Sequence, residues 1–132
     1  MLYRPFENQL NVLLATHQIQ RAQWTVLYYL SNFGNATLVE LSQYQSVEKP
    51  TVTRTVNRLE ELGMIEQVPS ADRREKRIQL TELGRQVYQE VRVTIDQFEQ
   101  NILRGISEQE QLEAIRIMGV IRTNLLEQVD AK

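Results

Sequence analysis

The sequence contains no cysteine among its 132 residues, only one histidine, His17, and few residues of glycine and proline, at 5 and 3. The lack of cysteine excludes disulfides, thiolate metal sites and thiol-based redox switches. A phosphate-cradling glycine loop and a metal-ligand cluster are also missing from the sequence. The carboxylates fall on predicted helix surfaces, without the convergent titratable groups of an active site. We therefore expect no enzyme, no cofactor and no metal site.

Long hydrophobic runs are missing as well. No window approaches the roughly 18 to 20 unbroken apolar residues of a membrane span. Residues 1–7 lack the basic leader and apolar run of a signal peptide. We therefore expect a soluble, cytoplasmic protein with no membrane partner. The composition, 42% hydrophobic and 24% charged, is typical of one globular domain.

The charge is weakly acidic overall but unevenly distributed. The net charge is −2 and the isoelectric point is about 5.5, which taken alone argues mildly against nucleic-acid binding. Basic residues nevertheless gather in residues 73–77, preceded by Lys49, Arg54 and Arg58. Because much of the acid lies elsewhere, as in residues 107–113, we predict a local basic surface on an acidic chain.

The first half of the chain has apolar residues at helical spacing. This spacing predicts helices over about 6–17 and 22–33, and Gly34-Asn35 ends the second of them. A capping box at 37–40 then begins a short helix that ends near residue 45. Another helix begins around 48–50 and ends at Gly63; its Pro50 is tolerated in a first turn, where amides lack helical partners.

The second half begins with two short strand patterns. Residues 64–68 and 76–80 flank a turn-rich, charged loop, which predicts a β-hairpin with a charged tip. Thr81 is a good N-cap for a long helix to about residue 104. A second capping box, over 107–110, begins a last apolar helix.

The helix over about 48–62 has two distinct faces when its residues are projected at about 100° per residue. The inner face is aliphatic and consists of Val52, Val56, Leu59 and Leu62. The opposite face is polar and carries Pro50, Thr53, Arg54, Asn57 and Glu61, with Thr51 and Arg58 at its flanks. Two helices joined by a tight turn and followed by a hairpin form a winged helix-turn-helix.

The sequence resembles the MarR family of bacterial regulators over nearly its whole length. The resemblance is densest from Lys49 to Glu66 and continues in Asp72-Arg73-Arg74 and in residues 80–85. Residues 23–27 match the family's second helix. The chain departs from the family's usual residues at the hairpin and at two helix caps, in Gln67, Gln20 and Glu48.

The resemblance implies a mainly α fold with a small β-hairpin, in which the winged helix-turn-helix carries long N- and C-terminal dimerisation helices. It implies one domain over 1–132, with a DNA-binding lobe at about 20–80 and dimerisation helices at about 1–19 and 82–132. A homodimer would bind a pseudo-palindromic operator with its two recognition helices about one DNA turn apart. We expect a sequence-specific regulator that represses transcription, the commoner behaviour in the family.

The recognition helix, at about 48–62, is expected in the major groove. Arg54 and Asn57 are candidates for base reading, because Arg pairs with guanine and Asn with adenine. Contacts to phosphate fix the register of the protein on the DNA. The wing, at about 69–75, is expected in the minor groove. There Asp72 would orient the loop and Arg74 would insert into the groove. The full set of predicted DNA-binding residues is Lys49, Pro50, Thr51, Thr53, Arg54, Asn57, Arg58, Asp72, Arg73, Arg74 and Lys76.

Family members often bind small aromatic or apolar effectors. Trp24, Tyr28, Tyr29 and Phe33 are candidates for such a pocket, although aromatics at helical spacing are more often simply core. For the lone His17 we expect a surface position, with a pH-sensitive or ligand-facing role as the alternative. The rival functional hypothesis is a winged-helix protein–protein interaction module without DNA binding, which the acidic isoelectric point favours.

Overall fold

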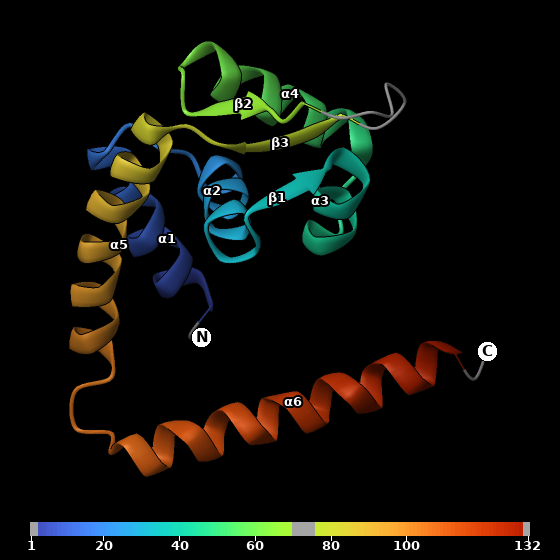
Figure 1. The fold of residues 1–132 in the computed structure, drawn as a ribbon. Coiled ribbons are helices and arrows are strands. Elements are labelled where there is room, and N and C mark those ends of the chain that lie inside the picture. The colour runs from blue at the N-terminus through green and yellow to red at the C-terminus, as the bar shows by residue number, and fades with distance from the viewer. Residues whose placement is uncertain (1–2, 70–75, 131–132) are drawn as a thin grey trace. The chain divides into compact units, whose positions relative to one another are not determined.

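The computed structural model describes residues 3–69 and 76–130 (Figure 1). Contacts divide the chain into two units, residues 1–97 and residues 98–132. The elements in chain order are α1 (Tyr3–Thr16), α2 (Arg21–Phe33), β1 (Asn35–Thr37), α3 (Leu38–Gln45), α4 (Lys49–Glu61), β2 (Ile65–Gln67), β3 (Arg77–Leu80), α5 (Glu82–Ile102) and α6 (Glu108–Asp130). The predicted helices and the hairpin are therefore confirmed.

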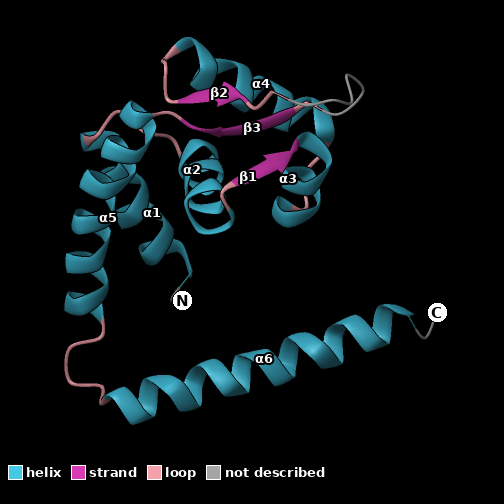
Figure 2. Cartoon of the chain, viewed as in Figure 1, coloured by secondary structure: helices cyan, strands magenta, loops and turns pink. Residues whose placement is uncertain are grey.

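The sheet has three antiparallel strands in the order β1-β3-β2 (Figure 2). The central strand pairs Ile78 with Ala36 of β1 on one side and with Gln67 of β2 on the other. Strand β1 is not among the elements predicted from the sequence. Three residues between Gly34 and a helix cap are too few to show the period-2 pattern of a strand.

The core of the lobe lies where α2 and α4 meet the sheet. Helix α2 contacts both α4 and β3, and α4 also contacts β2. The aliphatic face predicted for α4 is buried at Val52, Val56 and Leu59, which are 0–1% exposed. Leu62 differs because it is the C-cap residue, and it is only half-buried.

Most helix caps form as the sequence predicts. The hydroxyl of Thr37 accepts from the Glu40 backbone amide at 3.1 Å, and Glu40 Oε1 accepts from the Thr37 amide at 3.3 Å. Thr81 caps α5 by accepting from the Gly84 amide at 3.0 Å. Gln20 begins α2 differently: its backbone amide donates to Gln23 Oε1 at 2.9 Å.

Gly84 lies where α5 passes close to Met64, between α4 and β2. A Cβ at this position would stand 2.0 Å from the Met64 carbonyl oxygen, which belongs to backbone. That carbonyl also accepts a hydrogen bond from the Thr81 amide at 3.0 Å. The residue that permits this close approach is therefore glycine.

Side chains of α5 contact α2 and the residue that follows α1. The Tyr88 ring of α5 stacks on Trp24 of α2, with centroids 5.1 Å apart and planes 9° apart. His17, which follows α1, lies 2.8 Å from the Thr94 hydroxyl through Nε2. His17 was expected at the surface, and its side chain is half-buried there.

The second unit contains α6, which begins at the predicted capping box. The Glu110 amide donates to Ser107 Oγ at 3.1 Å, and Glu110 Oε1 accepts from the Ser107 amide at 2.9 Å. The large apolar side chains of α6 are exposed, at 45–63%: Leu112, Ile115, Ile117, Met118, Val120, Ile121, Leu125 and Leu126. Within residues 3–69 and 76–130, no helix is long and apolar enough to cross a membrane.

Candidate nucleic-acid interface

Helix α4 presents its polar face to solvent. Its inner aliphatic residues anchor the helix in the lobe, so the side chains opposite point outward. Pro50, Thr51, Arg54 and Asn57 are all exposed. Among the described residues, no hydrogen bond or ion pair engages the side chain of Arg54 or Asn57. Both side chains are therefore available to an external partner.

Two threonines on this helix have hydroxyl groups that differ in availability. The Thr53 hydroxyl donates to the Lys49 carbonyl at 2.9 Å, and Thr53 is half-buried. Thr51 is exposed, and its carbonyl accepts from the Thr55 hydroxyl at 3.1 Å. Thr51 is thus the better placed of the two predicted residues to donate to a phosphate.

The turn between α3 and α4 sets the direction of the recognition helix. Ser46 adopts a left-handed conformation with φ of 56°, and its amide donates back to the end of α3. The Ser42 hydroxyl donates to the Val47 carbonyl at 2.6 Å. Glu48 then begins α4 without a side-chain cap. The two helices are joined by a hydrogen-bonded turn.

Cations around α4 differ in how strongly they are held. Arg58 forms an ion pair with Glu61 at 3.1 Å, and both side chains are at least 60% exposed. An exposed pair of this kind is worth about 0–1 kcal/mol, so a phosphate can replace the carboxylate. Lys76 pairs with Glu60 at 2.8 Å, and both side chains are about 30% exposed. The Lys76 ion pair is thus less exposed than the Arg58 ion pair.

The wing loop carries Asp72, Arg73 and Arg74, which lie outside the described residues. The structure describes the two arms of its stem, up to Pro69 on one side and from Lys76 on the other. The Val68 amide donates to the Arg77 carbonyl at 2.8 Å. The Arg77 guanidinium donates to Asn35 Oδ1 at 2.9 Å and lies 3.5 Å from Glu40 Oε1. Backbone and side-chain hydrogen bonds therefore both hold the stem in place.

The chain matches known regulators in sequence and in fold. Residues 17–75 match the model of the MarR family. A helix-turn-helix-type transcriptional regulator of Bacillus subtilis, YwoH, is 37% identical over 101 residues, which are 76% of this chain and 74% of that protein. This chain belongs to the MarR family.

Further matches cover nearly all of the chain. A helix-turn-helix-type regulator of Staphylococcus aureus strain Mu50 is 30% identical over 130 residues, which are 96% of this chain and 89% of that protein. The solved structure of Staphylococcus aureus MarR in complex with salicylate and kanamycin is also 30% identical. It matches with a TM-score of 0.85 over 96% of this chain and 86% of that one.

As a MarR-family member, the chain is a DNA-binding transcription regulator with a winged helix-turn-helix, and not an enzyme. Membership of this family favours DNA binding over the rival hypothesis of an interaction module. The acidic isoelectric point is compatible with DNA binding, because the recognition helix carries Lys49, Arg54 and Arg58 on one short segment.

The four aromatics predicted to line an effector pocket of this MarR-family chain fall into two separate clusters. The ring centroid of Trp24 lies 6.3 Å from that of Tyr28, and Trp24 stacks on Tyr88, so this cluster joins α2 to α5. The ring centroid of Tyr29 lies 4.6 Å from that of Phe33 and 4.9 Å from that of Tyr44, so the second cluster joins α2 to α3.

The two clusters also differ in exposure. Trp24 is 8% exposed and belongs to the core, as the simpler interpretation had it, whereas Phe33 is 64% exposed. Partial burial and then the nearby Glu40 carboxylate raise the pKa of Tyr29 above its usual value. The split follows from helical geometry, since residues 24 and 28 lie about 140° around the helix from residues 29 and 33 at about 100° per residue.

The sequence did not predict the ion pairs of Glu60 with Lys76 and of Glu40 with Arg77. Both glutamates stand on helix surfaces, where carboxylates are common, and their cations lie far along the chain. A local pattern contains no signal for such a pairing. Only the sheet brings these groups together, because β3 lies between β1, which contacts α3, and β2, which contacts α4.

Proposed function

We propose that this regulator acts in the cytoplasm as a homodimer that represses transcription by binding a pseudo-palindromic operator. The exposed polar face of α4, with Arg54 and Asn57 unengaged among the described residues, is the observation that carries the proposal. Arg54 would read a guanine and Asn57 an adenine in the major groove. Both side chains project from a helix fixed by buried aliphatic residues.

The flanks of α4 would fix the register on DNA through phosphate. Lys49, Thr51 and Arg58 are exposed residues at the edges of the polar face. Pro50 would let the first turn approach the backbone without an unsatisfied amide, and Thr53 would touch a thymine methyl. Such contacts supply the salt-sensitive share of the affinity.

The wing would add a minor-groove contact. Arginine suits a narrow minor groove because the negative potential is enhanced there. In this proposal Arg74 inserts, Asp72 orients the loop and Arg73 contacts phosphate. The family's Asp-x-Arg element supports the assignment of Asp72 and Arg74.

A second copy of the chain would cover the exposed apolar residues of α6. Burying a large aliphatic side chain is worth about 1.5–3 kcal/mol. Leu112, Ile115, Met118 and Leu125 are each at least 60% exposed, so their burial would supply a large driving force. Dimerisation through this helix would give the two-fold symmetry that a pseudo-palindrome requires.

A small aromatic or apolar effector would regulate the dimer. The solved Staphylococcus aureus MarR relative contains salicylate, an aromatic anion. In this chain the more exposed cluster of Tyr29, Phe33 and Tyr44 is the better candidate contact, because Trp24 is already packed on Tyr88. An effector can act only by binding one DNA-binding state more tightly than another.

Fluorescence anisotropy tests the proposal. The chain is titrated against a labelled duplex from upstream of its own gene and against an unrelated duplex of equal length, at several salt concentrations. We expect tighter binding to the upstream duplex by about 1,000-fold, with affinity falling steeply as salt rises. Failure to bind either duplex at low salt would contradict the proposal.

A further inference from the structure

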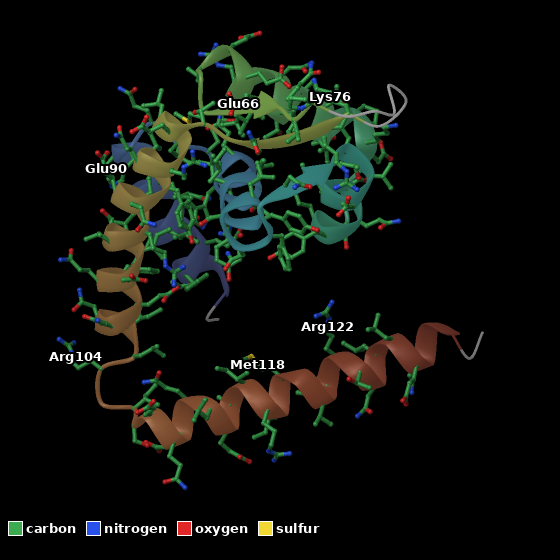
Figure 3. The ribbon with its side chains drawn as sticks, viewed as in Figure 1. Glu66, Lys76, Glu90, Arg104, Met118 and Arg122 are labelled. Carbon is green, nitrogen blue, oxygen red and sulfur yellow. The ribbon has the colours of Figure 1, made fainter. Side chains whose placement is uncertain are left out.

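The stem of the wing is held by two carboxylates from two different helices. Lys76 and Arg77 are the first described residues after the loop. Lys76 Nζ lies 2.8 Å from Glu60 Oε1 of α4, and Arg77 lies 3.5 Å from Glu40 Oε1 of α3. Figure 3 labels Lys76 where the chain enters β3 beside α4. Successive basic residues of the stem are therefore tied to both helices of the helix-turn-helix.

The backbone explains why the two ties go to different helices. Lys76 lies just before β3, whose first residue is Arg77. Arg77 stands directly across from Thr37 in the β1–β3 pairing, and Thr37 shares its capping box with Glu40. Arg77 thus reaches the first turn of α3, whereas the preceding residue reaches the last turn of α4.

Burial distinguishes the Lys76–Glu60 pair from its neighbour on the same helix. The Lys76 and Glu60 side chains are 31% and 28% exposed, and Glu60 Oε1 itself is buried, with Lys76 as an ion-pair partner but without a hydrogen bond among the described residues. Arg58 and Glu61 are 60% and 66% exposed. A buried carboxylate oxygen that loses its cation is left uncompensated, which is costly. Lys76 is therefore poorly placed to exchange Glu60 for a phosphate, although Arg58 can leave Glu61.

We propose that Glu60 and Glu40 are positioning residues, which hold the stem of the wing at a fixed place relative to the recognition helix. Lys76 then acts through Glu60 and not on DNA. A fixed stem sets the position from which the wing would reach the minor groove beside the recognition helix. This inference rests on the proposed binding of α4 and the wing to adjacent grooves.

Glu60 and Glu61 provide a matched pair of variants. Glu60→Gln and Glu61→Gln each remove one negative charge from the same end of α4, so simple electrostatics predicts tighter DNA binding for both. We expect Glu60→Gln to weaken binding by about 3- to 10-fold, and Glu61→Gln to leave it unchanged or strengthen it by up to about 3-fold. Equal or tighter binding by Glu60→Gln would overturn the proposal.

A charge swap separates positioning from direct contact at Lys76. We expect Lys76→Glu to weaken binding by about 10-fold or more, and the double variant Glu60→Lys with Lys76→Glu to return to within about 3-fold of the unchanged chain. A double variant as weak as Lys76→Glu alone would place Lys76 on the DNA and overturn the proposal. Thermal unfolding of each variant verifies that the lobe is folded.

Footprinting shows which groove is affected. In Glu60→Gln we expect hydroxyl-radical protection of the minor groove to weaken, whereas protection of guanine N7 in the major groove stays. A general loss of folding would reduce both protections equally, and that result would count against a positioning role.

Hydrogen exchange tests the ties without DNA. The Val68 amide donates across the stem to the Arg77 carbonyl. We expect it to exchange faster in Glu60→Gln and unchanged in Glu61→Gln. The unmodified protein could bind both duplexes equally while the Val68 amide still exchanges faster in Glu60→Gln than in Glu61→Gln. In that case the proposed function fails and the positioning of the stem stands. If the contrast is missing, the inference fails whatever the DNA affinity.

Discussion

Helices α5 and α6 are both long and carry apolar residues at helical spacing, but they differ in what covers those residues. In α5, Tyr88, Val91 and Ile95 are 8%, 1% and 4% exposed. In α6, Ile115 and Leu125 are 62% and 63% exposed. An amphipathic pattern indicates that a face will be buried, but it does not say by which chain.

The partner of α5 is identifiable within the same chain. Trp24 stacks on its Tyr88, and His17 meets its Thr94. The apolar face of α6 has the same chemistry, and we infer that a second copy supplies its cover. The DNA-binding lobe would then be complete in one chain, whereas binding to a two-fold operator would need two chains.

The largest expected effect comes from charging the apolar face of α6. We expect Ile115→Glu combined with Leu125→Glu to abolish the dimer and lower operator affinity by about 100-fold or more, because the second half-site no longer binds in the same event. Anisotropy and sedimentation measure the two effects. Asn124→Glu, on the opposite face of α6, is the control. Loss of operator affinity in this variant would contradict the inference that only the apolar face of α6 forms the dimer interface.

Truncating one isoleucine in each helix separates core from interface. We expect Ile95→Ala to lower the free energy of unfolding by about 2–5 kcal/mol at every protein concentration. Ile115→Ala is expected to lower stability more as the protein is diluted, because it weakens association. Urea unfolding at several protein concentrations checks both. The same concentration dependence for the two variants would contradict the assignment.

A base-reading side chain on α4 should affect DNA affinity alone. We expect Arg54→Ala to cost about 1–3 kcal/mol of operator affinity and to relax the preference at one base pair. Melting temperature and molecular mass are expected to stay unchanged, because Arg54 is exposed and outside both apolar faces. Anisotropy against single-base operator variants measures the change. An unaltered affinity would remove Arg54 from the interface.

The wing contributes a smaller expected share. We expect Arg74→Ala to weaken operator binding by about 5- to 10-fold with an unchanged melting temperature, because one minor-groove insertion is lost. An alternative is that Arg74 forms only a surface ion pair. Unchanged DNA affinity in the anisotropy titration would favour that alternative.

The smallest effect is a pH dependence at the start of α6. Hydrogen bonds from the Ser107 amide and with its side chain lower the pKa of Glu110 below its usual 4.5. A lowered pKa means that the stabilisation is present above about pH 4.5 and is lost as the pH falls through the folded-state value. We expect fraying of the first turn of α6 in acid, measured by NMR shifts at Ser107, and no such change in Glu110→Gln.

Local chemistry explains why much of the fold could be predicted from the sequence. The Thr37, Thr81 and Ser107 caps and the aliphatic face of α4 depend on residues within one or two turns. Strand β1 depends on pairing with β3, about 40 residues later, and so left no local pattern. The division of the aromatics could have been predicted by projecting α2 as α4 was projected.

The candidate site divides in the same way. The exposure of Arg54 and Asn57 follows from the period of α4, so the sequence was enough to place them on the polar face. The pairing of Lys76 with Glu60 depends on how the hairpin returns to the recognition helix. A basic residue beside a wing therefore looks like a DNA contact in the sequence, although the fold gives it an internal partner.

Sedimentation equilibrium of the intact chain at micromolar concentration tests the contrast between α5 and α6 most directly. If a second copy covers α6, the mass will be twice the 15.5 kDa of one chain. The Ile115→Glu and Leu125→Glu variant will then return to the mass of a single chain. A single-chain mass for the unmodified protein would contradict this inference, because a second copy would then not cover the apolar residues of α6.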